Sequence, residues 1–172
     1  MFISFFLTTS LLATSLLADT IGNVEYILPD SKKHWKLAAE KKSDKTVVST
    51  TRYYVPENRS SVALAEEGFS ANLNNIPGEP KEDENAVKAR IQKMFPQTDI
   101  EVHVITKEPD AILYTWAVPS TTKPIWGVSK HFHIENGSIN LMYRTTNQDI
   151  FNADKNDWIE ALKAAHIIKQ QP

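Results

Sequence analysis

The sequence predicts an α+β domain, built on a mostly antiparallel β-sheet flanked by two or three helices, from three observations. Segments rich in alternating or β-branched residues follow one another through short breaks over residues 45–144. Two further segments repeat apolar residues at three- and four-residue steps, which is the spacing of an amphipathic helix. Asn136-Gly137 separates two strand segments, and both residues tolerate the positive φ angles of a tight type I′ hairpin turn. Strands joined by short turns pair antiparallel, and helices with one apolar face cover such a sheet.

The expected strands follow the chain in order. Residues 45–56 are rich in β-branched and aromatic side chains, which suit a pleated and partly buried surface. Residues 111–118 are apolar on both faces, as a central strand would be. Only residues 107–110 separate this strand from the one before it, so the two should pair antiparallel. The full set of expected strands is 35–41, 45–56, 69–73, 99–106, 111–118 and the two arms of 127–145.

The first expected helix spans residues 83–95. Asp83 can cap its N-terminus and Glu84 favours the first turn. Pro96 ends the helix, because proline cannot continue the hydrogen-bonding pattern. One apolar stripe is formed by Val87, Ile91, Met94 and Phe95.

A second helix is expected over residues 156–169, where apolar residues share one face. Asp154 or Asn156 is its expected cap. A short third helix at 59–69 would be stopped by Gly68.

The first 18 residues differ from the rest of the chain. They carry no charged side chain and are rich in Phe, Leu, Ile and Ala, whereas Asp19 begins the polar part. This pattern predicts a secretory signal peptide cleaved after Ala18, leaving a single domain of residues 19–172. The expected location is the bacterial periplasm or the outside of the cell, with no membrane span after cleavage. An uncleaved membrane anchor is the alternative, although the apolar run is short for a span and contains Thr and Ser residues.

The composition narrows the possible partners and chemistries. The formal net charge is −2 and the pI is near 6.2, so a nucleic-acid partner is not expected. The chain has no cysteine, which excludes disulfides, cysteine nucleophiles and thiolate metal sites within it. The sequence contains no Gly-x-Ser-x-Gly elbow, phosphate-binding glycine loop or calcium-loop pattern. It therefore predicts no cofactor and favours a role that is not enzymatic.

The order of these elements resembles the PsbP-like fold, which the photosystem II extrinsic P protein shares with a Ran-binding nuclear import factor. The features that carry the resemblance are "WKLAAE", "VVSTTRYYVPENRSSVALAEEGFSANL", the helix at 83–95, the strands through Arg144 and the terminal "DWIEALKAAHII". The chain is similar in the same way to small uncharacterised exported bacterial proteins. The resemblance implies helices on both faces of an antiparallel sheet, an α/β/α sandwich. It implies no functional residue, because a shared fold does not carry a shared function.

The sharpest functional question concerns two histidines in segment 130–144. His131 and His133 alternate with apolar residues on an expected strand, so they share one face. The interpretation we favour is that both simply meet water on the outer face of a hairpin. A metal-binding protein or metal-dependent enzyme is the alternative, since imidazoles are zinc ligands, and His103 and Glu101 could join them from a neighbouring strand. A further interpretation is that the two histidines form a surface whose charge changes when they are protonated.

The loop at 119–127 is the other candidate recognition surface. Prolines stiffen it, and it contains Lys123 and Trp126. Amphipathic aromatic side chains are favoured at binding surfaces, although Trp126 could instead plug the edge of the core. The candidate binding residues are therefore Lys123, Trp126, His131 and His133.

These observations predict an exported binding or accessory protein without catalytic activity. It would act through a sheet face or through the loop at 119–127, on a partner such as another envelope or secreted protein. Two alternatives stay open, namely the metal-binding function at His131 and His133 and a structural role within a larger envelope assembly.

Overall fold

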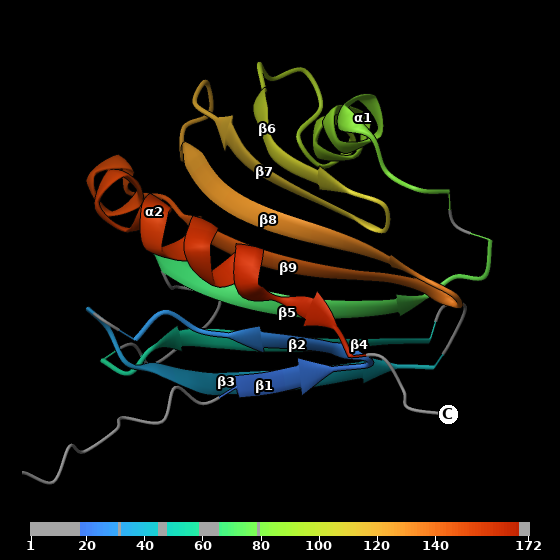
Figure 1. The fold of residues 1–172 in the computed structure, drawn as a ribbon. Coiled ribbons are helices and arrows are strands. Elements are labelled where there is room, and N and C mark those ends of the chain that lie inside the picture. The colour runs from blue at the N-terminus through green and yellow to red at the C-terminus, as the bar shows by residue number, and fades with distance from the viewer. Residues whose placement is uncertain (1–17, 31, 45–47, 59–65, 79, 169–172) are drawn as a thin grey trace, which may run out of the picture.

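The computed structural model describes residues 18–30, 32–44, 48–58, 66–78 and 80–168, and antiparallel β-sheet dominates it (Figure 1). The predicted signal peptide lies outside the described residues except for Ala18. Most of the predicted short helix at 59–69 also lies outside them. Of its described residues, 66 is a bend and 67–69 are strand.

Seven strands form the larger sheet, in the order β3-β4-β5-β9-β8-β7-β6, and every neighbouring pair is antiparallel. Two meanders, β3-β4-β5 and β6-β7-β8-β9, are joined where β9 pairs with β5. All seven strands expected from the sequence are therefore present. Their bounds are β3 Trp35–Ser43, β4 Val48–Pro56, β5 Glu67–Asn75, β6 Glu101–Glu108, β7 Ala111–Val118, β8 Ile125–Ile134 and β9 Gly137–Thr145.

A smaller sheet was not expected from the sequence. It has the order β1-β2-β10, with bounds β1 Ala18–Ile21, β2 Val24–Ile27 and β10 His166–Ile167. The first and the last described strands thus meet in it, since β2 pairs with both β1 and β10. Strands of two to four residues carry too short a pattern to stand out in a sequence.

The helix α1 spans Glu84–Met94, and its predicted cap is confirmed because Asp83 accepts a hydrogen bond from the Ala86 backbone N–H at 2.9 Å. The second helix, α2, spans Gln148–Ala164, with Asn147 as its cap. The prediction that it starts near residue 156 is therefore wrong by two turns.

The first turns of α2 were missed because their polar residues are satisfied by distant partners. Asp154, expected as a cap, is buried inside the helix and accepts a hydrogen bond from Lys33 at 2.6 Å. The same lysine ammonium donates to the carboxylate of Glu67 at 2.7 Å. These contacts fix the segment before β3 against both α2 and β5, and the sequence pattern of α2 does not contain them.

The α/β/α sandwich expected from the sequence is wrong. On one face of the large sheet, α2 contacts β7, β8 and β9, while the small sheet packs on β4 and β5 (Figure 1). On the other face, α1 packs at the β6–β7 end of the sheet, in a cluster that Ile125 of β8 and Met142 of β9 also contact. The fold is β-rich, with two sheets and, among the described residues, two helices, because β1, β2 and β10 form a second sheet beside α2 in place of a layer made of helices alone.

The main core lies between the large sheet and the layer made of α2 and the small sheet. Trp158 of α2 stacks on Tyr143 with ring centroids 4.5 Å apart and on Phe69 at 5.1 Å. Trp35 meets Trp158 edge-on at 5.2 Å. Such aromatic pairs add stabilisation beyond the area they bury, so these contacts tie β3, β5, β9 and α2 into one unit.

The hairpin between β8 and β9 is confirmed, but its turn differs from the prediction. Ile134 pairs with Gly137, so the two turn residues are Glu135 and Asn136. Neither has a positive φ, whereas Gly137 has a φ of 146°. The glycine is therefore used at the first position of β9, where β5 comes close, and not inside a type I′ turn.

Four tyrosines lie buried in polar contacts, and we expect them to make the protein sensitive to alkali. Burial raises the pKa of Tyr26 to about 12 and raises the pKa of Tyr54, Tyr114 and Tyr143 above the ordinary value. In the unfolded chain phenols ionise near pH 10, so the unfolded state loses protons first. The contribution of these groups to stability is complete below about pH 10 and falls as the pH rises toward 12 and beyond.

The measurement is a spectrophotometric phenolate titration run beside far-ultraviolet circular dichroism. The phenolate signal of these four residues should rise together with the loss of secondary structure. Ionisation of all five tyrosines of the chain near pH 10 in a protein that stays folded would contradict this expectation.

Candidate functional site

The two faces of the large sheet differ in character. On β5 and β9, residues such as Phe69 and Leu141 lie in the main core beneath α2 and the small sheet. Their neighbours along each strand point to the opposite face, because side chains alternate along a strand. Among the described residues, α1 covers only the β6–β7 side of that face, so β4, β5 and β9 have no helix over them (Figure 1).

Strand register aligns the side chains of this uncovered face into rows. Thr51 of β4 pairs with Asn72 of β5, and Asn72 pairs with Asn140 of β9. Asn140 pairs in turn with His131 of β8. Directly paired residues lie on the same face, so these four side chains form one row across four strands. We call this surface the polar face and define it as Thr51, Tyr53, Ser70, Asn72, His131, His133, Asn140, Met142 and Arg144.

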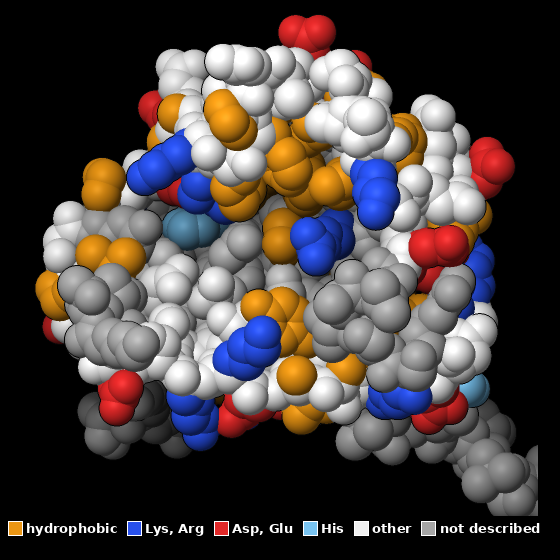
Figure 2. Space-filling view, turned by 180° about the vertical axis from the view of Figure 1, so that it is seen from behind, with side chains coloured by type: hydrophobic (Ala, Val, Ile, Leu, Met, Phe, Trp, Pro, Cys, Tyr) orange, Lys and Arg blue, Asp and Glu red, His pale blue; other side chains and the backbone are white. Residues whose placement is uncertain are grey.

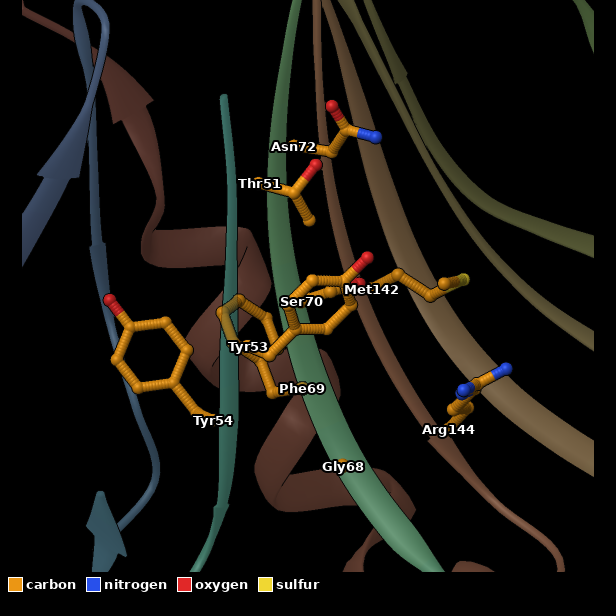
Figure 3. Close-up of a pocket in the computed structure, with 9 residues that line it drawn as sticks. All are labelled: Thr51, Tyr53, Tyr54, Gly68, Phe69, Ser70, Asn72, Met142 and Arg144. Atoms are coloured by element: carbon orange, nitrogen blue, oxygen red, sulfur yellow. The ribbon is translucent and has the colours of Figure 1, made fainter. Parts of the chain in front are cut away.

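The polar face is hollowed. Figure 2 shows this side of the molecule, with a depression near its centre and apolar side chains along one rim. A cavity of about 200 Å³ lies over β4, β5 and β9. In Figure 3, Asn72, Met142 and Arg144 point to one side of the strands and Tyr54 points to the other. The cavity is therefore bounded mainly by side chains of the polar face, with a backbone floor formed by the strands.

A second cavity, of about 240 Å³, lies at the α1 end of the same face. His131 and His133 line it, together with residues 81–83 before α1 and residues 107–112 around the β6–β7 turn. Since His131 belongs to the row that contains Asn72, the two cavities share one row of side chains.

His131 does not meet water, so the expected solvent-facing position is wrong. Its exposed fraction is 4%, and its Nδ1 lies 3.7 Å from the carboxylate of Glu82. Glu82 also accepts two hydrogen bonds from Arg90, at 2.7 and 3.1 Å, and Arg90 donates a third to the hydroxyl of Tyr114 at 2.6 Å. The segment just before α1 thus covers this part of β8, which alternation along β8 alone could not reveal.

Three buried side-chain atoms of the polar face have no hydrogen-bond partner among the described residues. They are Asn72 Oδ1, Asn140 Oδ1 and His133 Nδ1. A buried polar atom without a partner costs about 1–3 kcal/mol, and native folds contain few of them. Asn72 and Asn140 are direct cross-strand neighbours, so this cost is concentrated in the centre of the row.

The metal site that would include His103 is wrong. His103 lies between Val102 and Val104, whose partners Trp116 and Tyr114 pack under α1. His103 therefore points to the opposite face from His131, and Glu101 does so as well. Among the described residues, no group of three His, Asp or Glu side chains is placed to hold a metal ion.

The structure does not bring the four candidate binding residues together. Trp126 is half-buried against the main core, which places it on the α2 face, away from His131 and His133. Trp126 therefore packs at the edge of the core, which was the alternative to a binding role in the sequence analysis. Lys123 is exposed in the loop, and its carbonyl accepts a hydrogen bond from the Thr121 hydroxyl at 2.6 Å.

Sequence reasoning missed the central residues of the polar face. In "FSANLNN" the apolar Phe69, Ala71 and Leu73 alternate with Ser70 and with two asparagines. This alternation indicates that one face of the strand carries small uncharged polar groups. It is the sequence signal from which the polar face could have been predicted. What it cannot show is that Asn72 faces Asn140, which is 68 positions away in the chain.

The chain matches no family model and no curated protein sequence. Its function is therefore inferred from the geometry described above. Within the described residues, none of the helices combines the length and the apolar character that crossing a membrane requires.

Proposed function

We propose that this chain is an exported, non-catalytic binding protein that takes its ligand on the polar face of the large sheet. The observation that carries the proposal is the row Thr51, Asn72 and Asn140. A cavity lies over its Thr51 and Asn72 end, and the row contains buried acceptor atoms that no described residue satisfies. Groups kept at a cost in stability are typical of binding sites.

The chemistry of the row suits binding. Amide and hydroxyl side chains donate and accept hydrogen bonds without changing their protonation state near neutral pH. A small number of placed polar groups in a concave site fixes the orientation of a ligand. The strands that carry them, β4, β5 and β9, are interior strands paired on both sides, so the groups are held by a rigid scaffold, which lowers the entropy cost of binding.

Export is part of the proposal, and the contacts of the first described residues support it. Ala18 is the first residue of β1, and Asp19 is anchored by Arg52 Nη1, which donates to its carboxylate at 2.9 Å, and by the hydroxyl of Tyr54. Cleavage after Ala18 would leave these anchors in place and remove the apolar segment before them.

We expect the secreted or periplasmic form to begin at Asp19. Fractionation of cells that express the full chain, followed by N-terminal sequencing and intact mass measurement, checks this. Recovery of the chain in the membrane fraction with Met1 still present would contradict cleavage and favour the anchor alternative.

The polar face is tested with the double substitution Asn72→Ala/Asn140→Ala. Ligand-observed magnetic resonance against a mixed library of saccharides, short peptides and small polar metabolites should give binders whose affinity falls about tenfold or more in this variant, because two ligand hydrogen bonds are lost. The matched control is Asn152→Ala/Asn156→Ala, which removes two exposed asparagines of α2. Binding that is equally weakened in both variants, or the absence of any binder, would contradict the proposed function.

A further inference from the structure

We propose that the ligand of the polar face is a small organic oxyanion, with a carboxylate or phosphate head group that Arg144 binds and an apolar body about the size of one ring. This inference rests on the binding function proposed above and adds the chemical class of the ligand and the residue that selects it. The site is the first cavity, which lies over β4, β5 and β9.

Arg144 has no counter-charge in the part of the chain that the structure describes. Its side chain is exposed and lines the first cavity, and among the described residues it makes no hydrogen bond or ion pair. The other two described arginines are both paired, since Arg52 donates to Glu40 and Arg90 donates to Glu82. A guanidinium presents its N–H donors in a planar fork that matches a carboxylate or a phosphate. Arg144 therefore offers this fork to a ligand.

Two glycines leave Arg144 without a side chain directly beside it. Gly68 of β5 and Gly127 of β8 are its cross-strand partners. On the Gly127 side the ring of Trp116 takes the space, because its atoms would lie 2.5 Å from a Cβ built there. On the Gly68 side a Cβ would meet only the carbonyl oxygen of Tyr54, at 3.5 Å. The open side of Arg144 is therefore the side of the cavity, which Gly68 also lines.

The charge around this cavity is positive. Among the residues that line it, Arg144 is the one charged side chain. Lys41 of β3 adds a second cation, because its ammonium lies over the ring of Tyr53, 5.6 Å from the ring centroid, and Tyr53 lines the cavity. Lys41 forms no ion pair with a described residue. An anion in the cavity is therefore attracted by two cations.

The carboxylates of the surrounding strands do not neutralise Arg144. Glu40 of β3 and Glu67 of β5 point to the opposite face of the sheet, where both accept hydrogen bonds from cationic side chains. Glu66 precedes β5 and is exposed, but it does not line the cavity and forms no ion pair with Arg144. A ligand that brings its own negative charge would thus supply the missing partner of the guanidinium.

The second cavity offers no such excess of positive charge. Four carboxylates and two ammonium groups line it, namely Glu82, Asp83, Glu108, Asp110, Lys81 and Lys107. The two cations that reach these carboxylates from outside the lining, Arg90 and Lys130, only balance the count. An anion should therefore bind over β4, β5 and β9 and not at the α1 end of the polar face.

The remaining lining residues suit an apolar body beside the head group. Tyr53, Ser70 and Met142 form one cross-strand row, all three are partly exposed, and all line the cavity. Figure 3 shows Met142 and Arg144 on the same side of the strands. Ser70 is a diagonal neighbour of Arg144, within reach of a long side chain, so its hydroxyl can donate to the same head group. The cavity of about 200 Å³ holds one ring, since about 150 Å³ is enough for benzene.

The test is a magnetic resonance shift titration of the isotope-labelled folded chain with phenylacetate, phenyl phosphate, phenylacetamide and phenethylamine, which share one ring. At least one of the anions should bind, and the neutral amide and the cationic amine should bind about tenfold more weakly or not at all, because a hydrogen bond between charged groups is lost. The backbone amides of residues 68–72 and 142–144 should shift most. Added salt should weaken the binding of the anion, since both charges lie near the surface.

Two variants change the site in different ways. Arg144→Gln removes the charge and should weaken binding of the anion about tenfold or more. Gly68→Val keeps Arg144 but fills the space beside it and should abolish binding. The strand should accept valine, because Gly68 has no positive φ and a Cβ fits there. The matched control is Lys155→Gln, which removes one cation from α2 on the opposite face and should leave binding unchanged. The unfolding midpoint of Arg144→Gln should equal that of the parent, since Arg144 has no partner among the described residues.

The outcomes separate this inference from the proposed function. Binding of an anion with the stated variant pattern supports both, and the tighter anion identifies the head group. Phenylacetamide or phenethylamine that binds as tightly as the anions and shifts the same amides would overturn the oxyanion and leave the binding function intact. Anion binding that Arg144→Gln does not change would overturn the site.

Two further outcomes would also overturn the inference. If none of the four compounds binds, the ligand class is wrong, and the library screen with Asn72→Ala/Asn140→Ala then decides the binding function. Cosedimentation with phosphatidylglycerol vesicles that Arg144→Gln abolishes, without binding of phenyl phosphate, would assign Arg144 to a membrane surface and exclude the small ligand.

Discussion

Replacing Gly137 with alanine should destabilise the protein more than any other single methyl addition to its glycines, by about 4 kcal/mol or more. Gly137 starts β9 with a φ of 146°, a region that residues with a side chain rarely adopt. A Cβ built there would lie 1.9 Å from the Asn74 carbonyl oxygen and 2.8 Å from the Ile76 nitrogen. Both atoms are backbone, so no side-chain rotation relieves the clash, and either the hairpin or the end of β5 has to move.

The matched control for this substitution is Gly78→Ala. Gly78 also has a positive φ, of 76°, but a Cβ there would meet nothing within 4 Å. It should cost only the backbone strain, about 1–2 kcal/mol. Urea unfolding followed by circular dichroism gives both free energies, and equal losses for the two variants would show that the approach of β5 to Gly137 is not the cause.

The substitution Lys130→Met should lower the free energy of unfolding by about 2 kcal/mol, as expected when a buried carbonyl loses its hydrogen bond from a charged donor. Lys130 is 1% exposed on β8, and its ammonium donates to the carbonyl of Ala165 at 2.9 Å. It also lies 3.0 Å from the carboxylate of Glu108. Methionine keeps an apolar stem of similar length but offers no donor, so the buried carbonyl after the end of α2 loses its partner.

The effect of Lys130→Met should also be local. Because a cation near a helix C-terminus interacts favourably with the carbonyls there, the last turn of α2 and β10 should exchange their amide hydrogens faster. Lys155→Met is the control, since this residue of α2 lies over the Phe151 ring at 5.9 Å and should contribute about 1 kcal/mol or less. Equal stability losses, or unchanged hydrogen exchange over residues 162–168, would contradict the role given to Lys130.

Substitutions on the polar face should affect binding more than stability. Asn72 and Asn140 contribute buried acceptor atoms without a partner in the described chain, so replacing them should cost the fold less than a substitution in the main core. Gly137 and Lys130 have the opposite character, since they hold β5, β8 and α2 together. Variants of the two kinds therefore separate loss of binding from loss of structure in the same protein.

The sequence was informative wherever a short segment determines its own structure. Alternation and β-branched content marked all seven strands of the large sheet, because a strand's pattern lies within the strand. The cap Asp83 was identified because capping depends on residues three positions apart. In α2 the same logic failed, since its first turns carry Asp154, whose partner Lys33 lies 121 positions away.

What the sequence by itself determined is the seven strands of the large sheet, their antiparallel hairpins and the helix α1, all of which follow from contacts between near neighbours. Only the tertiary structure decided that α2 and the small sheet share one face, that the segment before α1 covers His131, and that Asn72 lies opposite Asn140. Alternation assigns a side chain to one of two faces, whereas the cover over that face and the neighbours across it come from pairing between distant segments, which no local pattern encodes.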